Sequence, residues 1–239
     1  MEIFLIRHGE MQYASVDRLD LDRVNAYASG ARQGPLSAKG VEQAGKVARY
    51  LSRLRIGSLY SSDFIRARQT AEEASRALGK PVEVLSQFRE LNVGRLTPEL
   101  HRGQAWMLQA LQRIERILPL GLGPSRSRGL VGYLLIVMYF RCWYGGMTVG
   151  GEPLPDAVAR VRAALRMLSD RHSGRGERVA VFTHGYFIHL TVNHVVDAWR
   201  APLRLIHTPY IRNGSVTHLR GSGNGRWKVE AYARTDHLS

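Results

Sequence analysis

Near its N-terminus the chain carries Ile3-Phe4-Leu5-Ile6-Arg7-His8-Gly9-Glu10, an apolar run that ends in an arginine, a histidine and a glycine. Such a run predicts a buried strand followed by a tight turn. Because ligands of open α/β sheets bind at the carboxyl ends of the strands, Arg7 and His8 would lie where a ligand binds. Taken alone, the motif also fits an arginine that caps a carbonyl group and an ordinary turn histidine. A phosphoryl-binding site therefore needs support from other segments.

A second segment has the same layout. It is Val179-Ala180-Val181-Phe182-Thr183-His184-Gly185, and it leads into a predicted helix over residues 186–196. Two predicted strands therefore present a histidine at the same kind of position.

A third segment, Ser58-Leu59-Tyr60-Ser61, predicts a short strand, after which Ser62 or Asp63 can cap a helix. This spacing puts Arg66 in the first turn of that helix, where the N-terminus already favours anions. A solvated arginine on a surface helix is the alternative. Three strand ends would then converge on two histidines and two arginines.

Four motifs follow one another along the chain: Arg7-His8-Gly9-Glu10, Gly34-Pro35-Leu36-Ser37-Ala38-Lys39-Gly40, Ser61-Ser62-Asp63-Phe64-Ile65-Arg66-Ala67-Arg68-Gln69-Thr70-Ala71 and Thr183-His184-Gly185. Together they resemble the motifs of the histidine phosphatase superfamily, the phosphoglycerate mutase-like group. Two more segments are similar to family segments: Phe88-Arg89-Glu90-Leu91-Asn92-Val93-Gly94, which would supply a catalytic acid, and Gly150-Gly151-Glu152, a turn before a long helix. The resemblance extends over most of the chain.

The resemblance implies a covalent mechanism. His8 would attack phosphorus and form a phosphohistidine, and Glu90 would protonate the departing oxygen and later activate water. The residues implied to be catalytic are His8, Glu90, Arg7, Arg66 and His184, and those implied to bind the substrate phosphate are Arg7, Arg66, His184 and Gly185. For Glu90 the alternative is a surface salt bridge with Arg89 or Arg95.

Composition is consistent with a globular enzyme. The chain has 239 residues, of which 44% are hydrophobic, so we expect a single domain over residues 1–239. The one cysteine, Cys142, excludes an intramolecular disulfide framework, and we expect a cytoplasmic protein. A net charge of +14 would steer small anionic substrates to the site. We do not expect nucleic-acid binding, because the chain has no zinc-finger spacing, RNP-type motif or basic zipper.

Strand and helix patterns alternate along the chain, which favours an α/β fold. We expect a three-layer α/β/α sandwich with a mostly parallel central sheet and a helical lid excursion. Ser37 can cap a helix whose apolar positions run from Val41 to Leu54. A strand is predicted at residues 81–85, a long core-facing helix begins near Leu154, and the tail offers two strands at residues 215–219 and 227–232.

Residues 95–149 form the predicted excursion, which would cover the site or select the substrate. It contains a predicted helix at residues 104–118, a basic loop at residues 121–129, and the apolar run Leu130-Val131-Gly132-Tyr133-Leu134-Leu135-Ile136-Val137-Met138-Tyr139-Phe140. Because that run is shorter than the roughly 20 residues of a membrane span, we expect none. A buried lid helix is the first interpretation, a homodimer interface the second and contact with a membrane surface the third. Arg126 and Arg128 could reach a second anionic group, or they could be solvated.

The sequence predicts no metal and no cofactor. His184, His189 and His194 recur at intervals of five, which on a helix separates successive side chains by about 140°. The chain also lacks a His-Glu-x-x-His pattern, paired cysteines and a Walker-type loop.

Three functions remain open at this point. A phosphomonoesterase acting on a small phosphorylated substrate is preferred, because Tyr186-Phe187-Ile188 gives an apolar helix start unlike the continuation in phosphoglycerate mutases. A phosphoglycerate mutase-type phosphoryl transferase is the second. A catalytically inactive binding protein of the same fold is the third.

Overall fold

The computed structural model describes residues 1–12, 34–97, 99, 103, 141–172, 176–195, 211–221 and 226–239. These residues fall into two compact units. The first lies within Met1–Ala14, Gln33–Leu91 and Pro155–Ser239, and the second within Asn92–Leu154. The predicted excursion at residues 95–149 falls within the range of the second unit, while the single domain over residues 1–239 stays a prediction.

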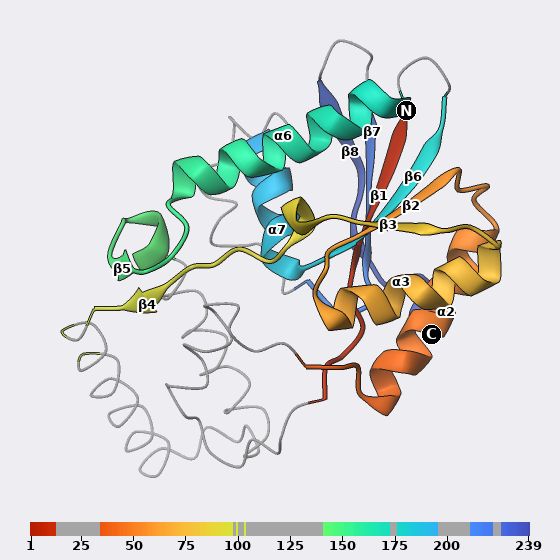
Figure 1. Cartoon of the computed structure of the whole chain (residues 1–239), viewed down its shortest axis with the longest axis horizontal. Helices are drawn as coiled ribbons and strands as arrows, with labels where there is room; N and C mark the ends of the chain where they lie inside the picture. Colours follow the sequence, from red (N-terminus) through yellow and green to blue (C-terminus); the bar gives the residue numbers. More distant parts are fainter. Residues whose placement is uncertain are drawn as a thin grey trace. The chain divides into compact units, whose positions relative to one another are not determined.

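Within the described part of the first unit, six strands form one sheet in the order β3-β2-β6-β1-β7-β8 (Figure 1). They are β1 (Glu2–Arg7), β2 (Ser58–Ser61), β3 (Val82–Val84), β6 (Arg178–Thr183), β7 (Val216–Gly221) and β8 (Trp227–Arg234). The first four in spatial order are parallel, and β7 and β8 continue the sheet as an antiparallel pair. The mostly parallel sheet and the tail strands predicted from the sequence are confirmed.

Helices cover both faces of this sheet (Figure 1). They are α2 (Ala38–Ser52), α3 (Ile65–Leu78), α6 (Leu154–His172) and α7 (Gly185–Leu190), and α7 continues into a π-helical turn, η2 (Thr191–Val195). Two short 3₁₀ turns are η1 (Ser86–Phe88) and η4 (Asp236–Leu238). The single helix predicted over residues 186–196 is therefore two helical segments of different pitch.

The two faces of the sheet pack against different helices. Since successive residues of a strand point to opposite faces, alternate side chains serve each layer. One apolar cluster joins β1, β6, α2 and α3, with members that include Phe4, Ile6, Val47, Leu51, Ala71, Ala74 and Phe182. On β2, the Tyr60 hydroxyl lies 3.0 Å from Nε2 of His172, at the end of α6. The three-layer α/β/α sandwich is therefore confirmed.

Two helix starts differ in how far the sequence predicted them. Ser37 caps α2 as expected, because its side chain accepts a hydrogen bond from the Gly40 N–H. Val41 is nevertheless 49% exposed, so the predicted apolar stripe is too wide at that residue. The expected cap of α3 by Ser62 or Asp63 is wrong: Phe64 is the N-cap residue and forms no side-chain capping bond. Both predicted capping groups contact other partners in the site, which are described below.

The second unit contains a two-stranded antiparallel ladder, β4 (Arg95–Leu96) with β5 (Thr148–Val149). Gly94 precedes it with φ of +74°, and a Cβ atom there would lie 2.6 Å from the Val149 carbonyl oxygen, so only glycine fits. The predicted helix at 104–118, the basic loop at 121–129 with Arg126 and Arg128, and the apolar run at 130–140 lie outside the described residues. The lid therefore stays a prediction. Among the helices that are described, none combines the length and the apolar composition of a membrane span.

Candidate active site at the carboxyl ends of the strands

His8 follows β1 directly and is buried. Its Nδ1 lies 2.7 Å from the Gly9 carbonyl oxygen, and its Nε2 lies 3.0 Å from Nε of Arg66. A carbonyl oxygen can only accept a hydrogen bond and a guanidinium N–H can only donate one, so the proton is on Nδ1 and the lone pair is on Nε2. Burial lowers the pKa of His8 well below its ordinary value, and the charges of Arg66 and Arg7 lower it further. The imidazole is therefore neutral, and its lone pair accepts the hydrogen bond from Arg66.

Arg66 lies in the first turn of α3, as the sequence predicts. Its guanidinium lies over the Phe64 ring, 4.9 Å from the ring centre. One turn later the Thr70 hydroxyl donates to the Arg66 carbonyl and accepts a hydrogen bond from the Gly9 N–H at 3.1 Å. The turn after β1 and the first turns of α3 are thus bonded to each other through Thr70, which the sequence did not reveal as a contact.

His184 follows β6 and is fully buried. The parallel register pairs Arg7 with Thr183, which brings the two histidines to the same edge of the sheet, with ring centres 5.2 Å apart. Nε2 of His184 lies 2.9 Å from the Ser62 hydroxyl oxygen, whereas Nδ1 has no hydrogen-bond partner among the described residues. Burial, and then the charge of Arg66, lower the pKa of His184 well below its ordinary value. This ring is therefore also neutral.

Glu90 is buried beside the start of α7 rather than in a surface salt bridge. Its Oε1 accepts hydrogen bonds from the N–H groups of Leu91 and Phe187, both at 3.1 Å, and its Oε2 accepts one from Tyr186 at 3.4 Å. Arg89, the proposed salt-bridge partner, pairs instead with Asp63. Burial raises the pKa of Glu90, and this effect exceeds the opposing effects of Arg66, the backbone N–H groups and Arg7. The carboxyl group keeps its proton to higher pH than an exposed glutamate.

Arg7 is buried between the two histidine turns. Its Nη1 donates to the Ile211 carbonyl oxygen, so the carbonyl-capping interpretation of this arginine is correct for one of its N–H groups. A Cβ atom on Gly185 would lie 3.4 Å from Nε of Arg7. Gly185 therefore lies directly against the guanidinium, at the first residue of α7.

Residues 211–215 contact the backbone of the turn that carries His8, and sequence reasoning missed them. The Asn213 side-chain amide donates to the carbonyl oxygens of His8 at 3.1 Å and of Gly9 at 3.2 Å. The Gly214 N–H donates to the carbonyls of Arg7 and His8. The Asn-Gly pair is a recognisable turn signal, but its contact with residues some 200 positions away is not readable from the sequence.

The motif at residues 34–40 acquires a physical explanation. A Cβ atom on Gly40 would lie 2.0 Å from the Glu10 carbonyl oxygen, and one on Gly9 would lie 2.4 Å from the Gly40 carbonyl oxygen. Two glycines therefore allow the first turn of α2 to approach the backbone after His8 closely.

Arg160 is a further residue that the sequence did not indicate. It lies on α6, and its Nη1 donates to the carbonyl oxygens of Gln87 at 2.9 Å and Arg89 at 3.1 Å. These two carbonyls lie on either side of the η1 end that leads into Glu90. Arg160 thus fixes the backbone from which the buried carboxyl group projects.

This arrangement combines a neutral imidazole with a lone pair, a second buried imidazole, two buried guanidinium groups and a buried carboxyl group. Such a set is suited to phosphoryl transfer, which depends on positioning and on compensation of negative charge. Among the residues that the structure describes, no group of three or more His, Cys, Asp or Glu side chains could bind a metal ion.

Residues 3–115 and 136–235 match the family model described as the histidine phosphatase superfamily (branch 1). The chain belongs to this superfamily. The resemblance that the motifs indicate is therefore confirmed for most of the chain.

The superfamily and the curated relatives of this chain are named for enzymatic activities, which supports an enzymatic function. Two proteins named "Probable phosphoglycerate mutase GpmB", from Shigella boydii serotype 18 and Escherichia coli O1:K1 / APEC, are both 38% identical to it, over 100% of this chain and 95% of each relative. Among solved structures, the native mycobacterial glucosyl-3-phosphoglycerate phosphatase has a TM-score of 0.66 at 22% identity, covering 98% of this chain and 99% of its own. The phosphoglycerate mutase of Bacillus anthracis has a TM-score of 0.64 at 21% identity, covering 99% and 94%. These two structures share the fold.

Proposed function

We propose that this protein is a metal-independent phosphomonoesterase that hydrolyses a small phosphate ester through a phosphohistidine on His8. The observation that carries the proposal is the pair of hydrogen bonds made by the two ring nitrogens of His8. The Gly9 carbonyl fixes the proton on Nδ1, so the lone pair is on Nε2, 3.0 Å from a guanidinium N–H that can bind the incoming phosphate. The nucleophile and an anion-binding group are thus adjacent before substrate arrives.

In the first step the Arg66 N–H exchanges its bond to Nε2 of His8 for one to a phosphate oxygen, which frees the lone pair. Nε2 then attacks phosphorus as the bond to the departing oxygen breaks, and Glu90 transfers its proton to that oxygen. Because Oε1 of Glu90 already accepts two N–H bonds at 3.1 Å, Oε2, with a single longer bond, is the oxygen that carries the proton. Arg7, Arg66, His184 and Gly185 would surround the non-bridging oxygens. Each fixed donor of this kind is worth about 10²–10³-fold in rate.

In the second step the Glu90 carboxylate removes a proton from water as the water oxygen attacks phosphorus. The phosphorus–nitrogen bond breaks, its electron pair returns to Nε2 of His8, and inorganic phosphate leaves. Glu90 is again protonated, as its burial and raised pKa favour. Arginines supply the positive charge in both steps, which supports a reaction without a metal ion or a cofactor.

A phosphoglycerate mutase-type phosphoryl transferase is the second candidate, favoured by the name of the GpmB relatives at 38% identity. We prefer the phosphatase because the Tyr186-Phe187-Ile188 continuation after His184 differs from that of mutases. An inactive binding protein is disfavoured by the presence of all five predicted catalytic residues in one buried cluster. A cytoplasmic location and a homodimer stay predictions.

The test measures inorganic phosphate release from p-nitrophenyl phosphate, 3-phosphoglycerate and phosphoserine in the presence of a chelator. Phosphorus NMR of the 3-phosphoglycerate reaction follows any 2-phosphoglycerate formed. The His8→Ala variant is the control for contaminating phosphatases. Chelator-resistant release that requires His8 supports the proposal. Isomer formation without phosphate release would establish the mutase instead, and loss of activity in chelator would contradict the metal-independent mechanism.

A further inference from the structure

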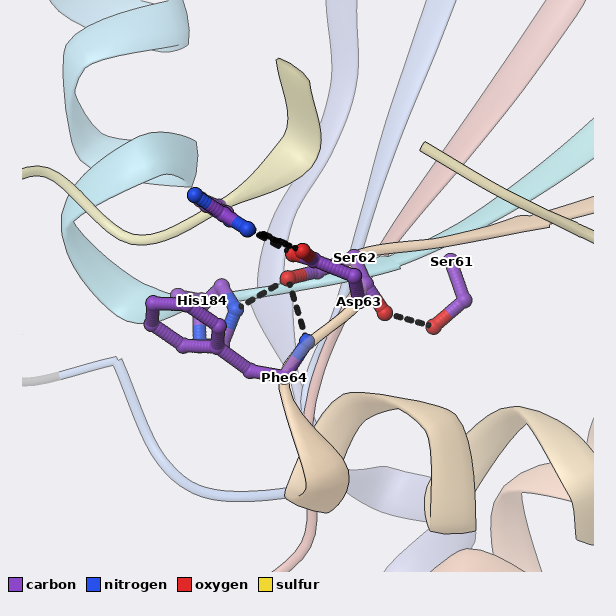
Figure 2. A network of polar contacts seen from close by, with 6 residues as sticks. Ser61, Ser62, Asp63, Phe64 and His184 are labelled. Atoms are coloured by element: carbon purple, nitrogen blue, oxygen red, sulfur yellow. Dashed lines mark hydrogen bonds and ion pairs between the residues drawn. The ribbon is translucent and has the colours of Figure 1, made fainter. Parts of the chain in front are cut away.

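Residues 61–64, at the end of β2 and in the turn before α3, lie beside His184 (Figure 2). The Ser62 hydroxyl contacts the His184 ring, and the Asp63 carboxylate accepts hydrogen bonds from Nε of Arg89, at 2.8 and 2.9 Å to its two oxygens. The Phe64 ring packs edge-on to His184, with ring centres 5.1 Å apart. Ser62 is itself fully buried. Its hydroxyl oxygen is therefore fixed in place relative to the imidazole.

The bonds of the Ser62 hydroxyl indicate where its hydrogen lies. Its oxygen accepts a hydrogen bond from the Phe64 N–H at 3.3 Å. Among the described residues, its one other hydrogen-bond partner is Nε2 of His184, at 2.9 Å. A buried hydroxyl hydrogen normally finds an acceptor, and Nε2 is the acceptor within reach. The hydroxyl therefore donates to Nε2.

A neutral imidazole carries one proton on its two nitrogens. If Nε2 of His184 accepts the hydroxyl hydrogen, the ring proton must be on Nδ1. That atom is fully buried and has no hydrogen-bond partner among the described residues. A buried donor without a partner is costly, and in a native site it indicates a missing ligand.

We infer that Ser62 is a positioning residue that selects the Nδ1–H tautomer of His184, and that this N–H donates to an oxygen of the substrate phosphate. The first half of the inference concerns the protein without substrate. The second half rests on the proposed function. Without the hydroxyl, the ring would be free to adopt the other tautomer, which presents a lone pair to the anion and repels it.

The tautomer is measured directly by nitrogen NMR of the ¹⁵N-histidine-labelled protein, in which protonated and unprotonated ring nitrogens have well-separated shifts. His184→Asn assigns the signal. We expect His184 in the wild-type protein to be protonated at Nδ1, and Ser62→Ala to move a large share of the population to the Nε2–H form. The matched control is Ser61→Ala, because Ser61 is equally buried but its hydroxyl, among the described residues, bonds only the Ser62 carbonyl oxygen.

An Nε2–H or doubly protonated His184 in the wild-type protein would overturn the inference, as would a Ser62→Ala spectrum identical to that of Ser61→Ala. The wild-type spectrum needs neither a variant nor substrate. The tautomer is therefore tested even if Ser62→Ala does not fold or the proposed activity is absent.

The phosphate contact is tested by titrating inorganic phosphate into each protein by calorimetry, with KM and kcat measured in parallel. We expect Ser62→Ala to weaken phosphate binding and raise KM by about tenfold, the value of one hydrogen bond, and Ser61→Ala to change both less than twofold. Unchanged phosphate affinity in a Ser62→Ala protein whose tautomer has shifted would contradict the second half of the inference. If no ester is hydrolysed, the binding titration still decides it.

Discussion

The turns after β1 and after β6 carry the same His-Gly dipeptide, yet the two histidines contact opposite kinds of group. His8 has a carbonyl acceptor at Nδ1 and a guanidinium donor at Nε2, so its lone pair is on Nε2. His184 has a serine hydroxyl at Nε2 and a buried Nδ1 with no partner among the described residues. Both rings are neutral for the same reason, burial beside two arginines. Their neighbours therefore make one a nucleophile and the other a donor in our proposals.

The largest expected difference between the two turns is in turnover. His8→Ala should reduce phosphate release to the uncatalysed level, because no other group supplies the attacking lone pair. His184→Ala should leave measurable activity, reduced by about 10²–10³-fold in kcat/KM, because it removes a donor to the transition-state oxygens. Steady-state kinetics on both variants, with circular dichroism to verify folding, tests this. Equal losses in the two variants would contradict the division of roles.

The next test concerns Glu90, which accepts hydrogen bonds from the N–H groups of Tyr186 and Phe187 at the start of α7. Glu90→Gln should lower kcat/KM on 3-phosphoglycerate by about 10²–10⁴-fold, and much less on p-nitrophenyl phosphate, whose leaving group needs no proton. We compare kcat/KM because it reports formation of the phosphohistidine and not the later attack of water, in which Glu90 acts on every substrate. A similar loss on both substrates would contradict the role of Glu90 as the acid.

The pH profile separates the same two groups. Activity should rise with pH as His8 loses its proton, at a pH below the ordinary 6.5, because burial lowers this pKa. It should fall again as Glu90 ionises, at a pH above the ordinary 4.5, because burial raises that pKa. With 3-phosphoglycerate as substrate, whose leaving oxygen needs a proton, the residual kcat/KM of Glu90→Gln should lack the alkaline fall. Its persistence in this variant would assign the fall to another group.

Substituting Gly9 and Gly185, the glycines that follow His8 and His184, should change the stability of the protein by different amounts. A Cβ atom on Gly9 would lie 2.4 Å from the Gly40 carbonyl oxygen, whereas on Gly185 its nearest neighbour is at 3.4 Å, an Arg7 side-chain atom. Gly9→Ala should lower the free energy of unfolding by about 3 kcal/mol, the upper end for overpacking. Gly185→Ala should remain within about 1 kcal/mol of the wild-type protein. Urea denaturation measures both, and equal values would show that the backbone after β1 can shift.

The smallest expected effect concerns Asn213, which contacts the backbone of the turn after β1. Asn213→Ala removes hydrogen bonds to the carbonyl oxygens of His8 and Gly9 and should cost about 1–2 kcal/mol of unfolding free energy. Asn193→Ala, in η2, is the matched control, because its amide contacts the ring of His189 in α7. We expect a smaller loss there. A loss as large as that of Asn213→Ala would mean that the β1 turn gains no particular stability from residues 211–215.

The sequence predicted elements where the signal is local. The ends of β1 and β6, the Ser37 cap of α2 and the place of Arg66 in the first turn of α3 follow from short patterns, and the structure confirms each. The expected cap of α3 failed because the helix begins only at Ile65, after Phe64, while the side chains of Ser62 and Asp63 contact His184 and Arg89. A local pattern cannot show which distant group will compete for a side chain.

By itself the sequence determined the family, the alternation of strands and helices, the position of Arg7, His8 and His184 at strand ends and that of Arg66 in the first turn of a helix. Only the tertiary structure decided the burial of Glu90 against α7, the contact of Arg160 with the backbone beside it, and the partners of the two histidines. The reason is physical. A tautomer or a shifted pKa depends on which oxygen or N–H lies within about 3 Å, and packing brings most of these groups from elements far apart along the chain.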